Sequence, residues 1–586
     1  MMFKITGWAE AKFLKNFKFK TQVSTYKYQR FKGTYNPASL PSREDGLGGY
    51  AYKQDYMEEK FNWDNTVNYS KTAGNHSVSA MVGSAFYDYG ENTLSVSGQG
   101  YLVDDAKWNN LGAVQDKNTL SVSSSEIKKR TLSFFGRVNY DYDKRYYITA
   151  TFRGDGASNF AAGNKWGFFP SMALRWNISN EKFLRRVSQI DELALKVSVG
   201  RSGNDAISAY RSLGALASVN NGYVFGGNVP VGYRPDRLDS PNLTWEKTDL
   251  YNIALTGSFF NSRLSFDLEA YYSNTTDLLL WVQVPHTTGY YQRLDNLGST
   301  KNSGVEFSIE SRNIVKRNFS WTTSFTISHN TQMVGDIGTE DYVIARKAPE
   351  TDYMMYGYVK GYPLNSLWGF KYAGVWKSQE EIERNKVTKS RAAMNNKLLG
   401  YPTYVDKNHD GTLDADDLCY LGNADPILYG GLQNTFRFGK FSLGVFFAYS
   451  LGGKIFNYSE LYMSGSRRTN QYRYMLNAWH PVKNPDSDLP AAGIIDGADL
   501  HSDRQVHDAS YLRLKNVSLG YTLNVRSKVL KEVKFAISGE NLYLWKNYNG
   551  FDPDVSSESD KGTIRRMDLG AYPKPRTVIF SVQLKY

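Results

Sequence analysis

The chain has 586 residues, 15% of them aromatic, and a formal net charge of +12. Its lysines and arginines are spread along the chain, without a dense block or a recognisable nucleic-acid-binding module, so this charge does not indicate a nucleic-acid partner. No run of 18 apolar residues is present, which excludes a transmembrane helix but not a chain that spans a membrane with short alternating strands.

The composition combines many aromatic residues with a polar average. Tyrosine alone contributes 43 residues, and the mean hydropathy is −0.50. Outer-membrane barrels have this combination because their lumen and loops are polar while aromatic rings gather at both membrane interfaces. The single cysteine, Cys419, cannot form an internal disulfide.

The first residues, Met1–Ile5, do not begin a secretory signal peptide, because neither an apolar stretch of sufficient length nor a small-residue cleavage site follows them. A barrel needs such a signal to reach the outer membrane. We therefore expect either that the chain is not a barrel or that it is the downstream part of a longer protein.

Alternating apolar and polar residues predict antiparallel strands along the whole chain. Two clear hairpins join 132–140 to 146–152 and 251–259 to 264–272. Between Tyr511 and Leu523 the alternation changes phase, which a β-bulge near Asn516 would explain. The final residues, Val578–Tyr586, alternate strictly and end on an aromatic carboxy-terminus, as the last strand of a membrane barrel does.

About seventeen such strands are predicted, with connections that alternate between short and long. Short turns are expected around 14–16, 70–75, 141–145, 179–191, 260–263, 311–318, 438–441 and 524–532. Long loops are expected around 30–60, 90–129, 154–170, 201–247, 274–303, 331–427, 454–510 and 546–576. Short periplasmic turns and long extracellular loops are the topology of an outer-membrane barrel, whereas a soluble sandwich gives no reason for this regularity. The fold class is therefore all-β, a transmembrane antiparallel β-barrel.

Several segments stand in a characteristic order: 135–142, 149–158, 166–171, 242–248, 271–279, 302–306, 406–411 and 572–577. Examples are Phe-Gly-Arg-Val-Asn-Tyr-Asp-Tyr in the first and Asp-Lys-Asn-His-Asp-Gly in the seventh. In order and spacing they resemble the SusC/RagA family of TonB-linked outer-membrane receptors. The segment 242–248 departs from the family pattern, because Pro241 precedes its Asn.

The resemblance implies a barrel of about 22 strands, of which this chain would supply about seventeen. An odd number of strands is missing upstream if the last strand ends on the periplasmic side, and five agrees with that. Family members carry a signal peptide, a plug and a TonB-contacting box before the barrel. We expect 1–586 to be the carboxy-terminal part of the barrel, unable to transport by itself.

One segment of the loop 331–427 has the spacing of a calcium loop, with oxygen ligands at alternate positions and Gly411 at the turn. The candidate ligands are Asp406, Asn408, Asp410, Thr412, Asp414 and Asp417. Position 12 is Asp rather than Glu, and the flanks are not helical, so this would be a structural Ca²⁺ site and not an EF-hand. The alternative is an Asp/Asn/Gly turn without a metal.

Aromatic residues gather in two of the long loops, 331–427 and 454–510. The candidates for ligand binding are Trp368, Trp376, Tyr458, Tyr462, Tyr472, Tyr474 and Trp479. Their flat rings suit stacking on sugars or on peptide side chains, and they equally suit packing against a partner lid or within the loop itself. Both interpretations stay open at this point.

No catalytic motif is evident, and the seven histidines show no metal-binding spacing, so we expect no enzyme. The resemblance implies an active importer of large nutrients, oligosaccharides (glycans) or peptides. It would work with a SusD-like surface lipoprotein and with TonB, which acts through the plug region that this chain lacks, and it would contact outer-membrane lipid. Two alternatives are a secreted all-β glycan-binding or glycan-cleaving protein and a passive porin.

Overall fold

The computed structural model covers residues 1–586 and describes all of them except 41–47, 102, 220–230, 291, 339–340, 349–352, 386–397, 465–469, 494–499, 526–528 and 558–563. The chain divides into two compact units. Unit 1 consists of Met1–Trp176, Val197–Leu250 and Thr275–Leu297, and unit 2 consists of Asn177–Lys196, Tyr251–Asn274 and Gly298–Tyr586.

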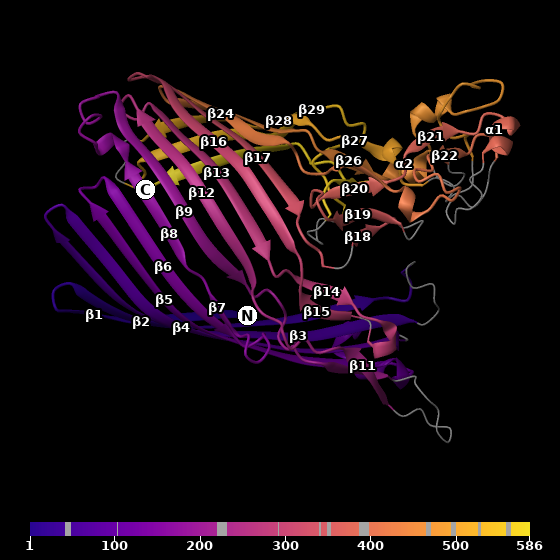
Figure 1. Ribbon diagram of the computed structural model, residues 1–586, viewed down its shortest axis with the longest axis horizontal. Helices are drawn as coiled ribbons and strands as arrows, with labels where there is room; N and C mark the ends of the chain where they lie inside the picture. Colours follow the sequence, from indigo (N-terminus) through magenta and orange to yellow (C-terminus); the bar gives the residue numbers. More distant parts are fainter. Residues whose placement is uncertain are drawn as a thin grey trace. The chain divides into compact units, whose positions relative to one another are not determined.

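The strands of unit 1 pair antiparallel in chain order, each with the next (Figure 1). They are β1 (Met2–Phe13), β2 (Phe17–Asn36), β3 (Gly49–Ala73), β4 (His76–Tyr101), β5 (Ser121–Tyr142), β6 (Tyr146–Ala157) and β8 (Ser171–Asn177). The expected short turns near 14–16, 70–75 and 141–145 are confirmed between these strands.

The expected long loops at 30–60 and 90–129 were wrong in their bounds. The strands β2 to β5 have 20, 25, 26 and 22 residues and occupy much of both ranges. Beyond the apolar stretch, both faces of these strands carry polar side chains, so the period-two signal is lost although the backbone ladder continues. Lys27 on β2, for example, forms an ion pair with Glu59 of β3 at 2.6 Å.

The strands of unit 2 also form antiparallel neighbours (Figure 1). They are β16 (Ser299–Val315), β17 (Phe319–Val334), β24 (Leu428–Phe438), β25 (Phe441–Leu451), β28 (Tyr511–Asn524), β29 (Glu532–Lys546) and β31 (Thr577–Lys585). The register of β28 shifts between Leu514 and Asn516. The predicted bulge near Asn516 is therefore confirmed.

The main sheet has 18 strands in the described part of the chain, and β9 (Ile190–Asn204), β12 (Glu246–Phe259) and β13 (Leu264–Thr276) belong to it. The short β7 (Trp166–Phe168) pairs with β6 just beyond the stretch of β6 that pairs with β8. Pro170, which has no backbone N–H, separates the two pieces. Counted as one interrupted strand, β7 and β8 bring the total to the predicted seventeen.

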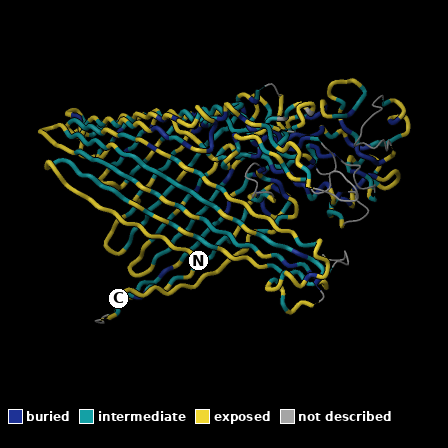
Figure 2. Tube along the Cα trace, turned by 90° about the horizontal axis from the view of Figure 1, so that it is seen from below, coloured by how far each residue is buried: buried dark blue, intermediate teal, exposed yellow. Residues whose placement is uncertain are grey.

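Many apolar side chains of the sheet are exposed. In β31 every residue is exposed, and Val578, Phe580 and Val582 are 60%, 78% and 62% accessible. Figure 2 shows the strands mainly in the colours of intermediate and exposed residues. An extended apolar surface of this kind is unfavourable in water and is the surface that a barrel presents to lipid.

The long loops have secondary structure of their own. In unit 1, β10 (Ala215–Val219) pairs with β11 (Gly232–Arg237) and β14 (Leu279–Gln283) with β15 (Gln292–Asn296). In the loop 331–427 of unit 2, four strands form one small sheet: β18 (Tyr342–Lys347), β19 (Met354–Val359), β20 (Ser366–Gly369) and β23 (Cys419–Asn423). The hairpin of β21 (Tyr372–Val375) and β22 (Pro402–Tyr404) and the helix α1 (Gln379–Arg384) lie in the same loop.

The loop 454–510 contains β26 (Lys454–Asn457), α2 (Tyr458–Met463) and β27 (Val506–Asp508), and β30 (Met567–Asp568) completes a three-stranded sheet. These elements and those of 331–427 enclose two apolar clusters. One contains Met355, Tyr356, Leu367, Phe456, Tyr458 and Met567, and the other contains Met354, Trp368, Phe370, Tyr404, Leu413 and Leu500. Both described α-helices have six residues, and no described helix has the length and apolar content to span a membrane.

Candidate functional site

The Asp-rich loop, residues 406–417, folds as a series of short turns in which acidic side chains bond to nearby backbone. The two carboxylate oxygens of Asp406 accept hydrogen bonds from the backbone amides of His409 and Gly411, at 2.7 and 2.9 Å. The same pattern recurs at Asn408, Asp410 and Asp414, which accept from the amides two residues further on. These side chains therefore shape the loop through Asx turns.

Asp417 closes the Asp-rich loop from inside. Its side chain accepts from the backbone amide of Lys407 at 2.8 Å through one oxygen and from that of Asp414 at 2.9 Å through the other. The residue is fully buried, with 0% exposure. Asp417 thus fastens the two ends of the loop together with hydrogen bonds.

Within the described residues, no group of three or more His, Cys, Asp or Glu side chains is placed to hold a metal ion. The six candidate ligands belong to one loop, and most of the hydrogen bonds that their side chains accept come from backbone amides. In addition, Nδ2 of Asn408 donates to Oδ2 of Asp410 at 3.0 Å. Calcium binding at this loop stays a prediction.

The aromatic candidates separate by burial. Trp368, Tyr458 and Trp479 are buried at 8%, 2% and 7% exposure, and Tyr462 is exposed at 41%. Trp376, Tyr472 and Tyr474 are half-buried. The structure places most of these rings against other loop residues, as the pair Tyr458 and Tyr462 shows with 5.4 Å between ring centroids.

Tyr472 and Tyr474 lie beside a buried acid of α2. Their rings stack at 5.5 Å, and the hydroxyl of Tyr474 donates to Oε1 of Glu460 at 3.4 Å. Glu460 is 4% exposed and also contacts Nε2 of His507 at 2.6 Å. Burial raises the pKa of Tyr474 to about 12. Tyr474 therefore serves as a neutral hydrogen-bond donor inside the loop.

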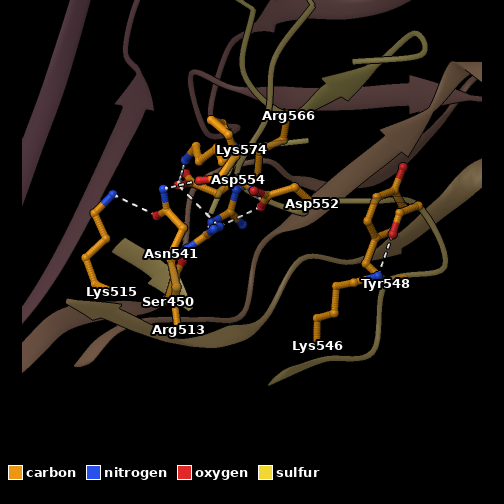
Figure 3. Close-up of polar contacts among 12 residues, drawn as sticks. Ser450, Arg513, Lys515, Asn541, Lys546, Tyr548, Asp552, Asp554, Arg566 and Lys574 are labelled. Atoms are coloured by element: carbon orange, nitrogen blue, oxygen red, sulfur yellow. Dashed lines mark hydrogen bonds and ion pairs between the residues drawn. The ribbon is translucent and has the colours of Figure 1, made fainter. Parts of the chain in front are cut away.

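A charged cluster that the sequence analysis did not identify lies where β28 and β29 meet the loop 547–576 (Figure 3). Nη2 of Arg513 on β28 lies 2.7 Å from Oδ1 of Asp552, and the two side chains are 5% and 3% exposed. Asp554 contacts the same Arg513 nitrogen at 3.9 Å and also Nζ of Lys574. Two acids and two bases therefore balance one another in this cluster.

A second buried contact anchors the same loop. The hydroxyl of Tyr548 donates to Oδ2 of Asp568 at 2.7 Å, and Nζ of Lys546 donates to the backbone carbonyl of Tyr548 at 2.7 Å (Figure 3). Burial, followed by the hydrogen bond to Asp568, raises the pKa of Tyr548 far above its usual range. The loop 547–576 is thus held at several points by hydrogen bonds of buried groups.

The paired strands, the exposed apolar side chains and the folded loops all describe a membrane barrel with structured loops. The family model described as "TonB dependent receptor-like, beta-barrel" matches residues 6–542. The chain belongs to this family. Its strands are those of an outer-membrane receptor barrel, and the predicted fold class is confirmed.

Two relatives of this receptor chain carry the comparison further. It is 32% identical to TonB-dependent receptor P26 of Formosa agariphila over 97% of the chain and 57% of that protein. It is 29% identical to TonB-dependent receptor SusC of Bacteroides thetaiotaomicron over 92% of the chain and 52% of that protein. The receptor chain therefore spans little more than half the length of these relatives.

Among solved structures, the RagAB peptide transporter superposes with a TM-score of 0.84 at 24% identity, covering 100% of this chain and 61% of that one. At this identity the likeness shows the fold. The resemblance of the receptor to the SusC/RagA family, expected from the sequence motifs, is confirmed by these matches together.

Proposed function

We propose that this chain is the barrel part of an active outer-membrane importer that takes up oligosaccharides or peptides too large for porins. The observation that carries the proposal is the family match over residues 6–542, together with relatives that are themselves TonB-dependent receptors. Binding and translocation would make no bond changes in the nutrient.

The proposal includes two partners. A SusD-like surface lipoprotein would cover the long loops, which have secondary structure of their own. RagAB, whose fold this chain shares, is described as a peptide transporter. TonB would supply energy through a plug region, as the resemblance to the SusC/RagA family implies. Among the aromatic candidates, Tyr462 is the most exposed and is proposed to contact the nutrient or the lipoprotein.

A gene deletion with complementation tests the proposal. Cells that lack the receptor should lose growth on one class of large oligosaccharide or peptide while they grow normally on its monomers. Complementation should restore growth only when TonB is intact. Uptake that persists without TonB would instead show a passive porin, and no growth difference on any large nutrient would contradict import.

A further inference from the structure

A cavity of about 770 Å³ lies in unit 2, where β24, β25 and β28 join their long loops. Its wall includes Tyr429, Ser450 and Tyr511 from the strands and Asp554, Arg565 and Arg566 from the loop 547–576. A volume of this size accommodates a small oligomer and not merely a bare ion.

The strand residues of the cavity wall share one face of the sheet. Tyr429 is directly opposite Ser450, and Ser450 is directly opposite Tyr511, so their side chains project to the same side. Arg513, two residues beyond Tyr511, is on that side too and forms the buried ion pair with Asp552. A buried charged pair is incompatible with a lipid-facing surface, so this face of the strands is the inner face of the barrel wall.

The carboxylates of the wall are already paired. Oδ1 of Asp425 lies 3.1 Å from Nη1 of Arg565, and its other oxygen accepts from Nδ2 of Asn365 at 2.8 Å. Asp554 has Lys574 and Arg513 as its cations. Neither acid therefore has a full charge left over for another base.

Arg566 differs from the other bases of the wall. Its guanidinium donates to the backbone carbonyl of Gly452 at 3.1 Å and to Oγ of Ser450 at 2.7 Å, both neutral acceptors. Within the described part of the chain, no carboxylate forms an ion pair with it. Burial lowers its pKa, while Tyr511, Asp554 and Asp425 act in the opposite direction. The guanidinium remains protonated and leaves one positive charge uncompensated.

The backbone of Arg566 is also unusual. Its φ is +55°, in the left-handed region that side chains other than Gly and Asn rarely adopt. Strained positions of this kind cluster at binding sites, because the surrounding structure must hold them in place. Arg566 combines this backbone conformation with a place in the wall of the cavity.

We propose that this cavity binds a carboxylate carried by the imported nutrient, with the guanidinium of Arg566 as its counter-ion. Arginine recognises carboxylates through two parallel hydrogen bonds, and the neighbouring tyrosines offer ring faces and hydroxyls to the rest of the ligand. The carboxylate comes from a uronic acid of an oligosaccharide or from the carboxy-terminus of a peptide. This inference rests on the proposed function, because the cavity must lie on the path of an imported nutrient.

Two ligand pairs test the inference by calorimetry on the receptor in detergent. The first is trigalacturonate with its neutral methyl ester, and the second is trialanine with its carboxy-terminal amide. In one of the pairs the acid should bind about 10- to 100-fold more tightly than its neutral form, and that pair identifies the source. Arg566→Gln should abolish the preference, and Arg566→Lys should keep part of it.

Lys515→Gln is the matched control, because it also removes one positive charge, and its Nζ contacts Asn541 outside the cavity at 3.2 Å (Figure 3). It should keep the full preference for the acid. No acid preference in either pair, or a preference that survives Arg566→Gln, would overturn the inference. TonB-dependent uptake of large nutrients is measured separately, in cells that carry the wild-type receptor. If this uptake is present although the receptor shows no acid preference, the proposed function stands without the carboxylate site. If the uptake is absent, the proposed function fails.

Discussion

The guanidinium of Arg513 lies 2.7 Å from the carboxylate of Asp552, and both side chains are almost completely buried. Arg513 also lies over the ring of Tyr511, with 5.3 Å between Cζ and the ring centroid. The pair joins β28 to the loop 547–576 across 39 residues of sequence. A strand of the barrel wall and the loop above it are thereby tied together.

Asp552→Ala should destabilise the folded receptor by about 3–5 kcal/mol, because it leaves the buried Arg513 cation without its main partner. Asp554→Ala is the control: this acid is 44% exposed and 3.9 Å from Arg513, so its loss should cost about 1 kcal/mol or less. Urea midpoints, read from the gel mobility of folded and unfolded barrel, measure both. Equal midpoints for the two variants would contradict the assignment.

Asp417→Ala should open the Asp-rich loop without unfolding the barrel. The backbone amides of Lys407 and Asp414 lose their acceptor, at about 0.5–1.5 kcal/mol each. Hydrogen exchange at these two amides should accelerate in Asp417→Ala. The control, Asp416→Ala, changes an exposed residue and should leave exchange at Lys407 unchanged. Unaltered protection in Asp417→Ala would show that other contacts hold the loop.

Calcium should bind the Asp-rich loop with a dissociation constant of about 10⁻⁴–10⁻³ M, as in extracellular modules, if the prediction from its spacing holds. Calorimetry after chelation measures this directly. Asp410→Ala should abolish the binding, whereas Asp416→Ala, which removes an acid outside the six candidate ligands, should not. A heat of calcium binding that is the same in wild type and in Asp410→Ala would refute the calcium site.

Gly430→Ala should weaken the pairing of β24 with β17. A Cβ at this position would lie 2.0 Å from the carbonyl oxygen of Thr326, which is backbone and cannot turn away. We expect the free energy of unfolding to fall by about 1–3 kcal/mol, which lowers the urea midpoint. Gly90→Ala, where a Cβ meets nothing within 4 Å, should change the midpoint little. Similar effects of the two variants would argue against the close approach.

The alternation of side chains predicts the architecture wherever one face is apolar. The hairpin of β12 and β13 and the bulge near Asn516 followed directly from it. It failed in the parts of β2 to β5 that lie beyond the apolar stretch, where the pair Lys27–Glu59 lies on one face and the pair Glu58–Lys60 on the other, so that both faces are polar. Backbone hydrogen bonds continue there, but they leave no trace in a hydropathy pattern.

The charged cluster and the residues of the cavity wall were harder to predict than the strands. Arg513 of β28 meets Asp552 across 39 residues, and Arg566 meets Ser450 across 116 residues, so no local spacing links the partners. The aromatic loops were identifiable from composition, but composition alone does not distinguish the buried Tyr458 from the exposed Tyr462. Such distinctions depend on tertiary packing of the loops, which local patterns do not encode.

The strand β4 has 26 residues, more than a bilayer requires. At about 3.3 Å per residue and a tilt of about 40°, such a strand rises more than about 60 Å, twice the thickness of the hydrocarbon layer. The excess length continues the hydrogen-bonded sheet into the aqueous layer outside the lipid. Ladder hydrogen bonds to the neighbouring strands β3 and β5 therefore stiffen this part of β4 outside the lipid.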